Sequence, residues 1–229
     1  MTSPQLWVSD LGTVRYAEAL ELQRSVAADR ISGKIPEDVL LLVEHPPVVT
    51  LGRSSKDGHL TASPELLKLR GVELFEVERG GDVTFHGPGQ LVGYPIIDLK
   101  RHKQDLHWYL RTVEQALIDT LEALGIAAGR NTGYTGVWTG GQKIASIGVH
   151  ARDWVTWHGF ALNVSTELSY FDLIVPCGIP DVTMTSIARE LKGTPVSLEH
   201  VAQTATNALA RLFRLDPVSV PLDQLGALK

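Results

Sequence analysis

Apolar residues recur at helical spacing in three long stretches of the chain. Each stretch places them on one face, and a polar N-cap residue, Asp105 or Ser197, precedes two of the three. Two shorter segments begin at Ser63 and Ser186. The pattern predicts helices over residues 15–31, 63–70, 105–124, 186–191 and 197–213.

Between the helices, apolar residues fill or alternate along segments of strand length. The run over residues 39–43 has no polar face, which is typical of a strand buried on both sides. Gly140-Gly141 is typical of a hairpin turn. We predict strands over residues 6–8, 39–43, 48–51, 73–78, 83–85, 91–97, 136–139, 143–150 and 157–164, and find no strong pattern after Asp216.

The order of these elements indicates the fold class. Strands cluster between the helices instead of alternating strictly with them, which favours an α+β fold, a mixed sheet flanked by helices, over a doubly wound parallel sheet. No internal repeat or low-complexity linker divides the chain. We therefore expect a single domain over residues 1–229.

Composition narrows the class of protein. Of 229 residues, 44% are hydrophobic and 21% charged, as in ordinary globular proteins, and a net charge of −5 argues against nucleic-acid binding. We find no apolar run of membrane-spanning length, no signal-peptide pattern and no zinc-ligand spacing. The single cysteine is typical of the reducing cytosol, so a cytoplasmic location is expected, with no membrane and no metal.

That cysteine lies in an apolar segment with two prolines and a glycine, Ile174-Val175-Pro176-Cys177-Gly178-Ile179-Pro180. Proline fixes φ and glycine permits dihedrals closed to other residues, so the segment predicts a rigid turn. A thiol on such a turn can face a pocket as a nucleophile, although a lone cysteine is more often an inert, buried side chain. A neighbouring Lys or His would favour the first interpretation, but periodicity cannot place one.

A glycine-rich segment runs from Arg79-Gly80-Gly81 to His86-Gly87-Pro88-Gly89-Gln90. Its glycines allow the backbone to approach a ligand closely. On an extended strand Thr84 and His86 would face a site, while Val83 and Phe85 would face the core. The alternative is a glycine-rich hairpin capped by a histidine, since no phosphate-loop spacing is matched.

Two later strands carry residues suited to a pocket. Lys143 shares a strand face with apolar residues, which predicts a place at the edge of a buried pocket unless the side chain extends to water from the strand end. Gly159 and Ala161 share another face and leave room beside the sheet. That room would suit an acyl chain or the close packing of another element.

Together these motifs resemble the lipoyl(octanoyl) transferase family, also called lipoate–protein ligase B. The matching pieces follow the family's order from about His45-Pro46 onward. They are Arg79-Gly80-Gly81 with Thr84 and His86-Gly87-Pro88-Gly89-Gln90; Lys143-Ile144-Ala145-Ser146-Ile147-Gly148; His158-Gly159 with Ala161-Leu162-Asn163; Pro176-Cys177-Gly178-Ile179; and Thr185-Ser186. The resemblance implies the fold of the biotin and lipoate protein ligase catalytic domains.

The resemblance also implies an acyltransferase without a cofactor. Cys177 would take an octanoyl group from acyl carrier protein as a thioester, and a lysine of a lipoyl domain would then attack it to form an amide. Lys143 would favour the thiolate and pass protons. The residues implied to line the acyl pocket are Arg79, Gly80, Gly81, Asp82, Val83, Thr84, Phe85, His86, Ser146, Ile147, Gly148, Gly159, Phe160 and Ala161.

The partners implied are octanoyl-acyl carrier protein as donor, and the lipoyl domains of 2-oxoacid dehydrogenases and the glycine cleavage H protein as acceptors. Because carrier proteins are acidic and this chain is acidic overall, docking calls for a local basic patch. Lys100-Arg101-His102-Lys103 is the candidate, and a solvated loop is the alternative.

Three other functions fit parts of the pattern. An ATP-dependent lipoate or biotin ligase on the same fold is the main alternative, and it would need no thiol. A cysteine thioesterase would release free octanoate. A non-catalytic module would bind octanoate reversibly and form no covalent adduct.

Overall fold

A seven-stranded mixed sheet forms the centre of the molecule in a computed structural model that describes residues 4–179 and 181–226. Pairing is parallel only among its first three strands and antiparallel elsewhere. In spatial order the strands are β10 (Asp216–Ser219), β1 (Gln5–Thr13), β2 (Asp38–Glu44), β6 (Gln90–Ile96), β9 (Val155–Asn163), β8 (Gln142–Arg152) and β7 (Val137–Thr139).

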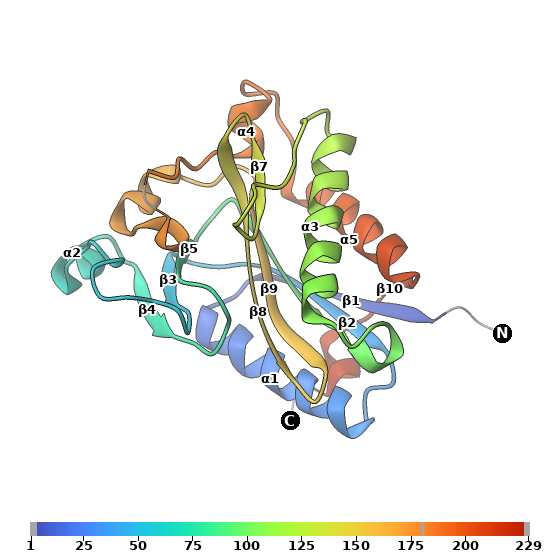
Figure 1. Cartoon of the computed structure of the whole chain (residues 1–229). Coiled ribbons are helices and arrows are strands. Elements are labelled where there is room, and N and C mark those ends of the chain that lie inside the picture. The colour runs from blue at the N-terminus through green and yellow to red at the C-terminus, as the bar shows by residue number, and fades with distance from the viewer. Residues whose placement is uncertain (1–3, 180, 227–229) are drawn as a thin grey trace.

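Helices cover both faces of this sheet. Figure 1 shows α3 (Leu106–Ala123) and α5 (Leu198–Phe213) together on one face and α1 (Tyr16–Ser32) on the other. On β2, Leu40 and Leu42 pack toward α3 and α5, whereas Val39 and Leu41 pack toward α1. The strand therefore has no polar face because neither face meets water, which confirms the predicted buried strand.

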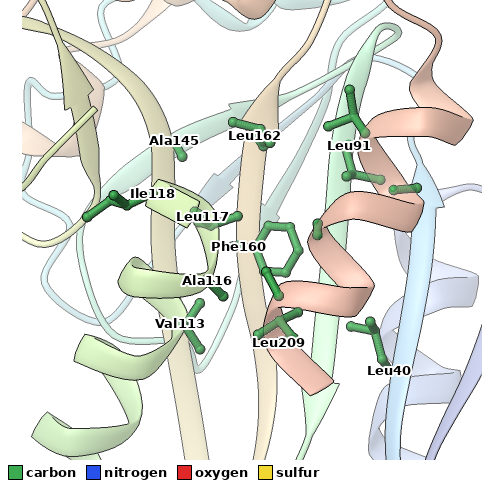
Figure 2. Close-up of a cluster of buried hydrophobic side chains, with 14 of the residues drawn as sticks. Leu40, Leu91, Val113, Ala116, Leu117, Ile118, Ala145, Phe160, Leu162 and Leu209 are labelled. Atoms are coloured by element: carbon green, nitrogen blue, oxygen red, sulfur yellow. The ribbon is translucent and has the colours of Figure 1, made fainter. Parts of the chain in front are cut away.

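The larger core lies between the sheet and the α3–α5 pair. Figure 2 shows apolar side chains of α3 and α5 beside β9, with Phe160 of β9 at the centre of the cluster. Asp105 and Ser197 accept hydrogen bonds from backbone N–H groups in the first turns of α3 and α5, as their N-cap positions predict.

A second sheet of three strands stands beside the first: β4 (Glu73–Glu76), β3 (Val48–Leu51) and β5 (Val83–His86). Its apolar face packs against α2 (Pro64–Leu69) and the short helix η2 (Leu168–Leu173). The turn η3 (Pro176–Gly178) contacts β5 directly. The remaining short helices are η1 (Leu99–Arg101), α4 (Ile187–Glu190) and η4 (Leu222–Leu225).

The predicted α+β class, the helices and the hairpin turn at Gly140-Gly141 are confirmed. The chain after Asp216 differs, because it forms the edge strand β10, paired with β1. The strand contains Pro217 and three of its four residues are exposed, so it shows no alternating pattern. Pro180, at the end of the predicted cysteine turn, lies outside the described residues.

Candidate active site

A pocket opens where the small sheet meets the large one, with a cavity of about 190 Å³. Its walls come from the segment that leads into β5, from β5 itself, and from β6, β8 and β9. The turn η3 and the 133–135 loop contribute one side each. The lining residues are Tyr16, Arg79, Gly81, Asp82, Val83, Thr84, His86, Val92, Tyr94, Gly133, Tyr134, Thr135, Lys143, Ser146, Ile147, Gly148, His158, Gly159, Phe160, Ala161, Cys177 and Ile179.

Cys177 lies on a tight turn at one wall of this pocket. Its φ is 58°, a left-handed conformation that costs a non-glycine residue energy. Hydrogen bonds from Gly178 N to Val175 O (2.9 Å) and from Ile179 N to Pro176 O (3.1 Å) hold the turn. The predicted turn is confirmed over Pro176–Gly178, and the thiol is only partly buried.

Lys143 reaches the thiol from the start of β8. Its Nζ lies 3.1 Å from Cys177 Sγ and donates to Thr135 O at 3.1 Å. The ammonium also lies 4.8 Å from the ring centroid of Trp138, a cation–π distance. Only 1% of Lys143 is exposed, so the side chain does not extend to water. The sulfur and the amine, which the sequence could not place together, are in contact.

Backbone pairing fixes Lys143 in this position. Its N–H donates to Thr183 O at 2.8 Å, and Thr185 N donates to its carbonyl at 2.9 Å. Asn163 Nδ2 donates to Thr185 O, and Gln90 Nε2 donates to Asn163 Oδ1, both at 2.9 Å. The amides of Gln90 and Asn163 therefore connect the glycine-rich segment to the segment that holds the lysine, a positioning role absent from the sequence predictions.

Arg79 is a buried cation in the pocket wall, 6% exposed. Its guanidinium donates to the side-chain and main-chain oxygens of Thr50 and to Gly80 O rather than to a carboxylate. Burial lowers the pKa of Arg79, and charge on Tyr16 and Cys177 opposes that shift. Gly148 permits this arrangement, because a Cβ there would lie 2.8 Å from Gly80 O and 3.1 Å from Arg79 Cδ.

Two buried histidines lie at the β5–β6 side of the pocket, and burial lowers the pKa of His45 to about 4 and of His86 to about 3. His45 Nδ1 lies 2.7 Å from Val14 O, which can only accept a hydrogen bond, so Nδ1 carries the proton. Its Nε2 then accepts from Tyr94 Oη at 2.7 Å. The network is satisfied by neutral imidazoles.

A histidine–aspartate pair supports the cysteine turn from behind. His59 Nδ1 lies 2.7 Å from Asp82 Oδ2, and Val175 N donates to His59 O at 2.7 Å. A Cβ on Gly178 would collide with Asp82 Oδ2 and lie 2.9 Å from His59 Cε1. Glycine at 178 therefore lets this pair approach the turn.

The structure places most of the predicted pocket residues on its lining, with two exceptions. Phe85 packs in the core of the small sheet, stacked on Tyr170 with ring centroids 4.7 Å apart. Gly80 turns its carbonyl toward Gly148 and is not part of the lining. The alternating pattern of β5 accounts for Phe85, although Val83 contributes both to the core and to the pocket.

Gly159 combines the two interpretations that the sequence left open. It lines the pocket, and a Cβ there would collide with Gly93 O and lie 2.6 Å from Pro95 Cδ on the neighbouring strand. Close strand packing therefore requires this glycine, and the slot lies beside it.

Several lining residues were not predicted, among them Tyr16, Tyr94, Tyr134 and His158. Tyr16 occupied an apolar position of a helix, Tyr94 lay in a strand and Tyr134 in a loop, so no local pattern marked them. His158 carried a signal, since it precedes Gly159 in one of the motifs quoted above.

The predicted basic patch lies far from this pocket. Leu99 N donates to Trp154 O, which places residues 99–103 at the turn of the β8–β9 hairpin. Lys143 is at the opposite end of β8, about 30 Å away at ~3.3 Å per strand residue. Acids neighbour the cations as well: Lys100 Nζ lies 3.7 Å from Asp98 and Lys103 Nζ lies 3.1 Å from Asp105. The position does not support a docking role for this cluster.

Two further findings concern the 222 residues over 4–179 and 181–226. They contain no group of three His, Cys, Asp or Glu side chains arranged to hold a metal ion. None of their helices combines the length and apolar character needed to cross a membrane.

The two sheets and the pocket between them define the catalytic-domain fold of protein ligases that act with lipoate or biotin. A solved lipoate-protein ligase A bound with ATP superposes with a TM-score of 0.77 at 15% identity, covering 99% of this chain and 92% of that one. The biotin protein ligase of Aquifex aeolicus is more distant, with a TM-score of 0.51 at 11% identity over 93% and 70% of the two chains.

The chain belongs to the lipoyl protein ligase A/B catalytic domain family, whose model matches residues 15–210. A curated relative from Solibacter usitatus, named octanoyltransferase, is 52% identical over 205 residues, 89% of this chain and 90% of the relative. The expected family and fold are thereby confirmed.

Proposed function

We propose that this chain is an octanoyltransferase that moves an octanoyl group from octanoyl-acyl carrier protein to a lysine of lipoyl domains through a thioester on Cys177. The contact of 3.1 Å between Lys143 Nζ and Cys177 Sγ at the wall of the pocket carries the proposal. A buried ammonium stabilises a neighbouring thiolate, which is the nucleophilic form of cysteine.

In the first step the Cys177 thiolate attacks the thioester carbonyl of the donor. A carbon–sulfur bond forms to Cys177, the bond to the carrier's thiol breaks, and that thiol leaves with a proton from Lys143. One thioester replaces another, so the step is close to balanced in free energy and needs no ATP. Lys143 is neutral after it.

In the second step the neutral amine of the acceptor lysine attacks the acyl-enzyme. A carbon–nitrogen bond forms, Cys177 leaves as a thiolate, and Lys143 takes the proton that the amine gives up. The ammonium–thiolate pair is restored and the product is an octanoyl amide. A single lysine thus gives a proton in one half-reaction and receives one in the other.

The acyl chain lies, in this proposal, between the Arg79–His86 segment, residues 146–148 of β8 and residues 159–161 of β9. Phe85 packs in the core behind this wall and Gly80 is not part of the lining, so neither contacts the chain. Ser146 Oγ, 3.7 Å from Cys177 Sγ, is the neighbour of the sulfur on β8.

Donor and acceptor proteins follow from the same proposal. The donor is octanoyl-acyl carrier protein, and the acceptors are the lipoyl domains of 2-oxoacid dehydrogenases and the glycine cleavage H protein. A bipartite lipoate protein ligase of Thermoplasma acidophilum with its E2 lipoyl domain shares the fold at a TM-score of 0.73. That likeness supports a lipoyl domain as acceptor.

The alternative is an ATP-dependent ligase, since the matched family model is that of the lipoyl protein ligase A/B catalytic domain. The solved structures that share the fold are 11–17% identical to this chain, whereas the octanoyltransferase relatives are 43–54% identical. A ligase also has no need for a lysine held against a thiol. Both observations favour the transferase.

The test is the complete transfer reaction with a lipoyl domain as acceptor. With octanoyl-acyl carrier protein and no ATP, we expect the acceptor to gain one octanoyl group, detected by mass, and Cys177→Ser to abolish the gain. Modification that requires ATP and free octanoate would overturn the proposal in favour of the ligase. Release of free octanoate without an acceptor would point instead to a thioesterase.

A further inference from the structure

His158 has an unusual backbone conformation for a residue in the middle of a strand. It pairs with Val149 of β8, yet its φ is 57°. Only glycine adopts this region readily, so the surroundings must hold the residue there. Its N–H donates to Gln23 Oε1 of α1 at 3.0 Å, and 1% of the residue is exposed. Strained backbone of this kind clusters at functional sites.

The ring of His158 has no hydrogen-bond partner for either nitrogen within residues 4–179 and 181–226. Glu78 Oε1 is 3.8 Å from Nε2, but that carboxylate already accepts from Arg24 and from Trp157 Nε1 at 3.0 Å. Gln23 Nε2 is also buried and, over the same residues, unpartnered. Burial lowers the pKa of His158 although the Glu78 carboxylate opposes that shift, so the ring offers one donor and one acceptor.

His158 lines the pocket at a definite distance from the reacting sulfur. The pocket follows the β8–β9 hairpin, from Ser146 beside Cys177 to the level of Val149, which pairs with His158. Those three residues of strand span about 10 Å. With carbon–carbon bonds of ~1.5 Å, an extended eight-carbon acyl chain on the sulfur would reach about 9 Å. The end of an octanoyl chain therefore arrives at His158.

The other groups at this end are polar as well. Tyr16 and Tyr94 line the pocket there, and Tyr94 follows Gly93, which pairs with Phe160 of β9. Neither ring nitrogen of His158 has a hydrogen bond within the described residues, so a chain one methylene longer would press an apolar group against the ring and shut solvent out as a partner. A buried polar group left without a partner is costly, so longer apolar chains are rejected.

We propose that His158 forms the polar end wall of the acyl pocket, which limits apolar chains to the octanoyl length and admits a longer chain only if it ends in a hydrogen-bonding group. The inference rests on the proposed function, because it names the substrate class of the same pocket. His158 is a specificity-determining residue in this account, and it takes no part in the bond-making steps.

The first test uses the wild-type protein and two donors of equal length. Nonanoyl- and 8-hydroxyoctanoyl-acyl carrier protein carry the same number of chain atoms, and only the second ends in a hydroxyl. We expect kcat/KM for 8-hydroxyoctanoyl to exceed that for nonanoyl by about tenfold or more. Equal values, or a preference for nonanoyl, would overturn the inference while octanoyl transfer itself stood.

The second test replaces the end wall. His158→Leu should reverse the preference in favour of nonanoyl, since the wall becomes apolar. His150→Leu is the matched control: His150 lies on the same hairpin and also has a buried unpartnered nitrogen among the described residues, but it does not line the pocket. The His150→Leu variant should prefer 8-hydroxyoctanoyl over nonanoyl as the wild-type protein does. An unchanged preference in a folded His158→Leu variant would contradict the proposal, and the wild-type donor comparison decides the question if that variant does not fold.

Discussion

At the scale of single residues, the proposed chemistry depends on a lysine that is buried with no carboxylate partner among residues 4–179 and 181–226. Lys143 contacts the carbonyl of Thr135, the ring of Trp138 and the sulfur of Cys177, and 1% of it is exposed. A buried cation requires compensation, and of these three neighbours only the thiol can ionise. In the proposed mechanism a thiolate on Cys177 supplies that compensation.

Removal of the Lys143 amine should therefore slow both half-reactions of the proposed transfer. Lys143→Met keeps the length and apolar stem of the side chain, and we expect octanoyl transfer to fall by roughly 10²- to 10⁴-fold, the usual contribution of a positioned acid–base group. Lys68→Met, on the exposed side of α2, is the control and should transfer at the wild-type rate. A loss below about threefold in Lys143→Met would show that another group handles the protons.

The cysteine turn gives a second prediction at this scale. Gly178 and Gly193 both have positive φ, 65° and 83°, but an added Cβ meets Asp82 and His59 at Gly178 and nothing within 4 Å at Gly193. Alanine at either site costs backbone strain of about 1 kcal/mol. Only Gly178→Ala should also slow transfer, by about tenfold or more, because the turn must move. Similar rates for the two variants would exclude that coupling.

The sequence predicted Cys177 and Lys143 as catalytic residues, but it did not predict that the two side chains are in contact. Pro176-Cys177-Gly178-Ile179 and the lysine motif were recognisable because their residue types are local features. The contact of Lys143 with Cys177 joins segments 34 residues apart, through pairing of Lys143 with Thr183 and Thr185. No periodicity reports such pairing. Phe85 shows the reverse case, since the motif implies a place in the pocket whereas the side chain packs in the core of the small sheet.

At the scale of elements, buried histidines connect the two sheets. His45 lies between β2 and β3, His86 ends β5, and their rings are 6.0 Å apart. Tyr94 of β6 and Tyr16 of α1 complete the cluster, and burial raises the pKa of Tyr16 to about 12. The cluster is stable only while its imidazoles remain neutral.

This cluster makes stability depend on pH. The pKa values of His45 and His86 in the folded state, about 4 and about 3, lie below the value near 6.5 in the unfolded chain. As pH falls below 6.5 the unfolded chain takes up protons first, so folding stability decreases by up to about 1.4 kcal/mol per pH unit for each histidine.

Urea unfolding between pH 6.5 and 5, above the range of most carboxyl groups, measures this slope. His45→Asn should reduce the slope, whereas His107→Asn, at an exposed position of α3, should leave it unchanged. A slope that is the same in all three proteins would contradict the assignment of neutral histidines.

Elements were predicted well where one face or both faces are apolar, as in α3, α5 and β2. The edge strand β10 was missed because it is short, exposed and contains Pro217. The stripe on α1 predicted a helix, but it could not show that Tyr16 reaches the pocket and that Gln23 holds the strained backbone of His158. Both contacts join α1 to segments more than sixty residues away.

At the scale of the whole molecule, the pocket lies at the junction of the two sheets. Its walls include residues of the small sheet and residues of the large sheet. The chain passes directly from β2 to β3 and from β5 to β6, and Tyr16 packs against Val48 and Val77 beside the small sheet. The α+β fold class and the flanking helices could be predicted from the order of helices and strands along the sequence. The division into two sheets could not be predicted, because it depends on which strands pair.

We propose that the two sheets form one cooperative domain. Calorimetry should give a single transition whose calorimetric and van't Hoff enthalpies agree. Gly148→Ala, which would push Arg79 and Gly80 away from β8, should lower the midpoint without splitting the transition. Two resolved transitions would show that the small sheet unfolds by itself.

The central claim is that Cys177 carries the acyl group, and intact mass tests it most directly. The protein is incubated with octanoyl-acyl carrier protein, without ATP and without an acceptor, beside Cys177→Ser. We predict one octanoyl adduct on the wild type alone, removed by hydroxylamine as a thioester is. A wild-type protein without an adduct that nevertheless modifies a lipoyl domain, or an adduct that persists in Cys177→Ser, would contradict the account.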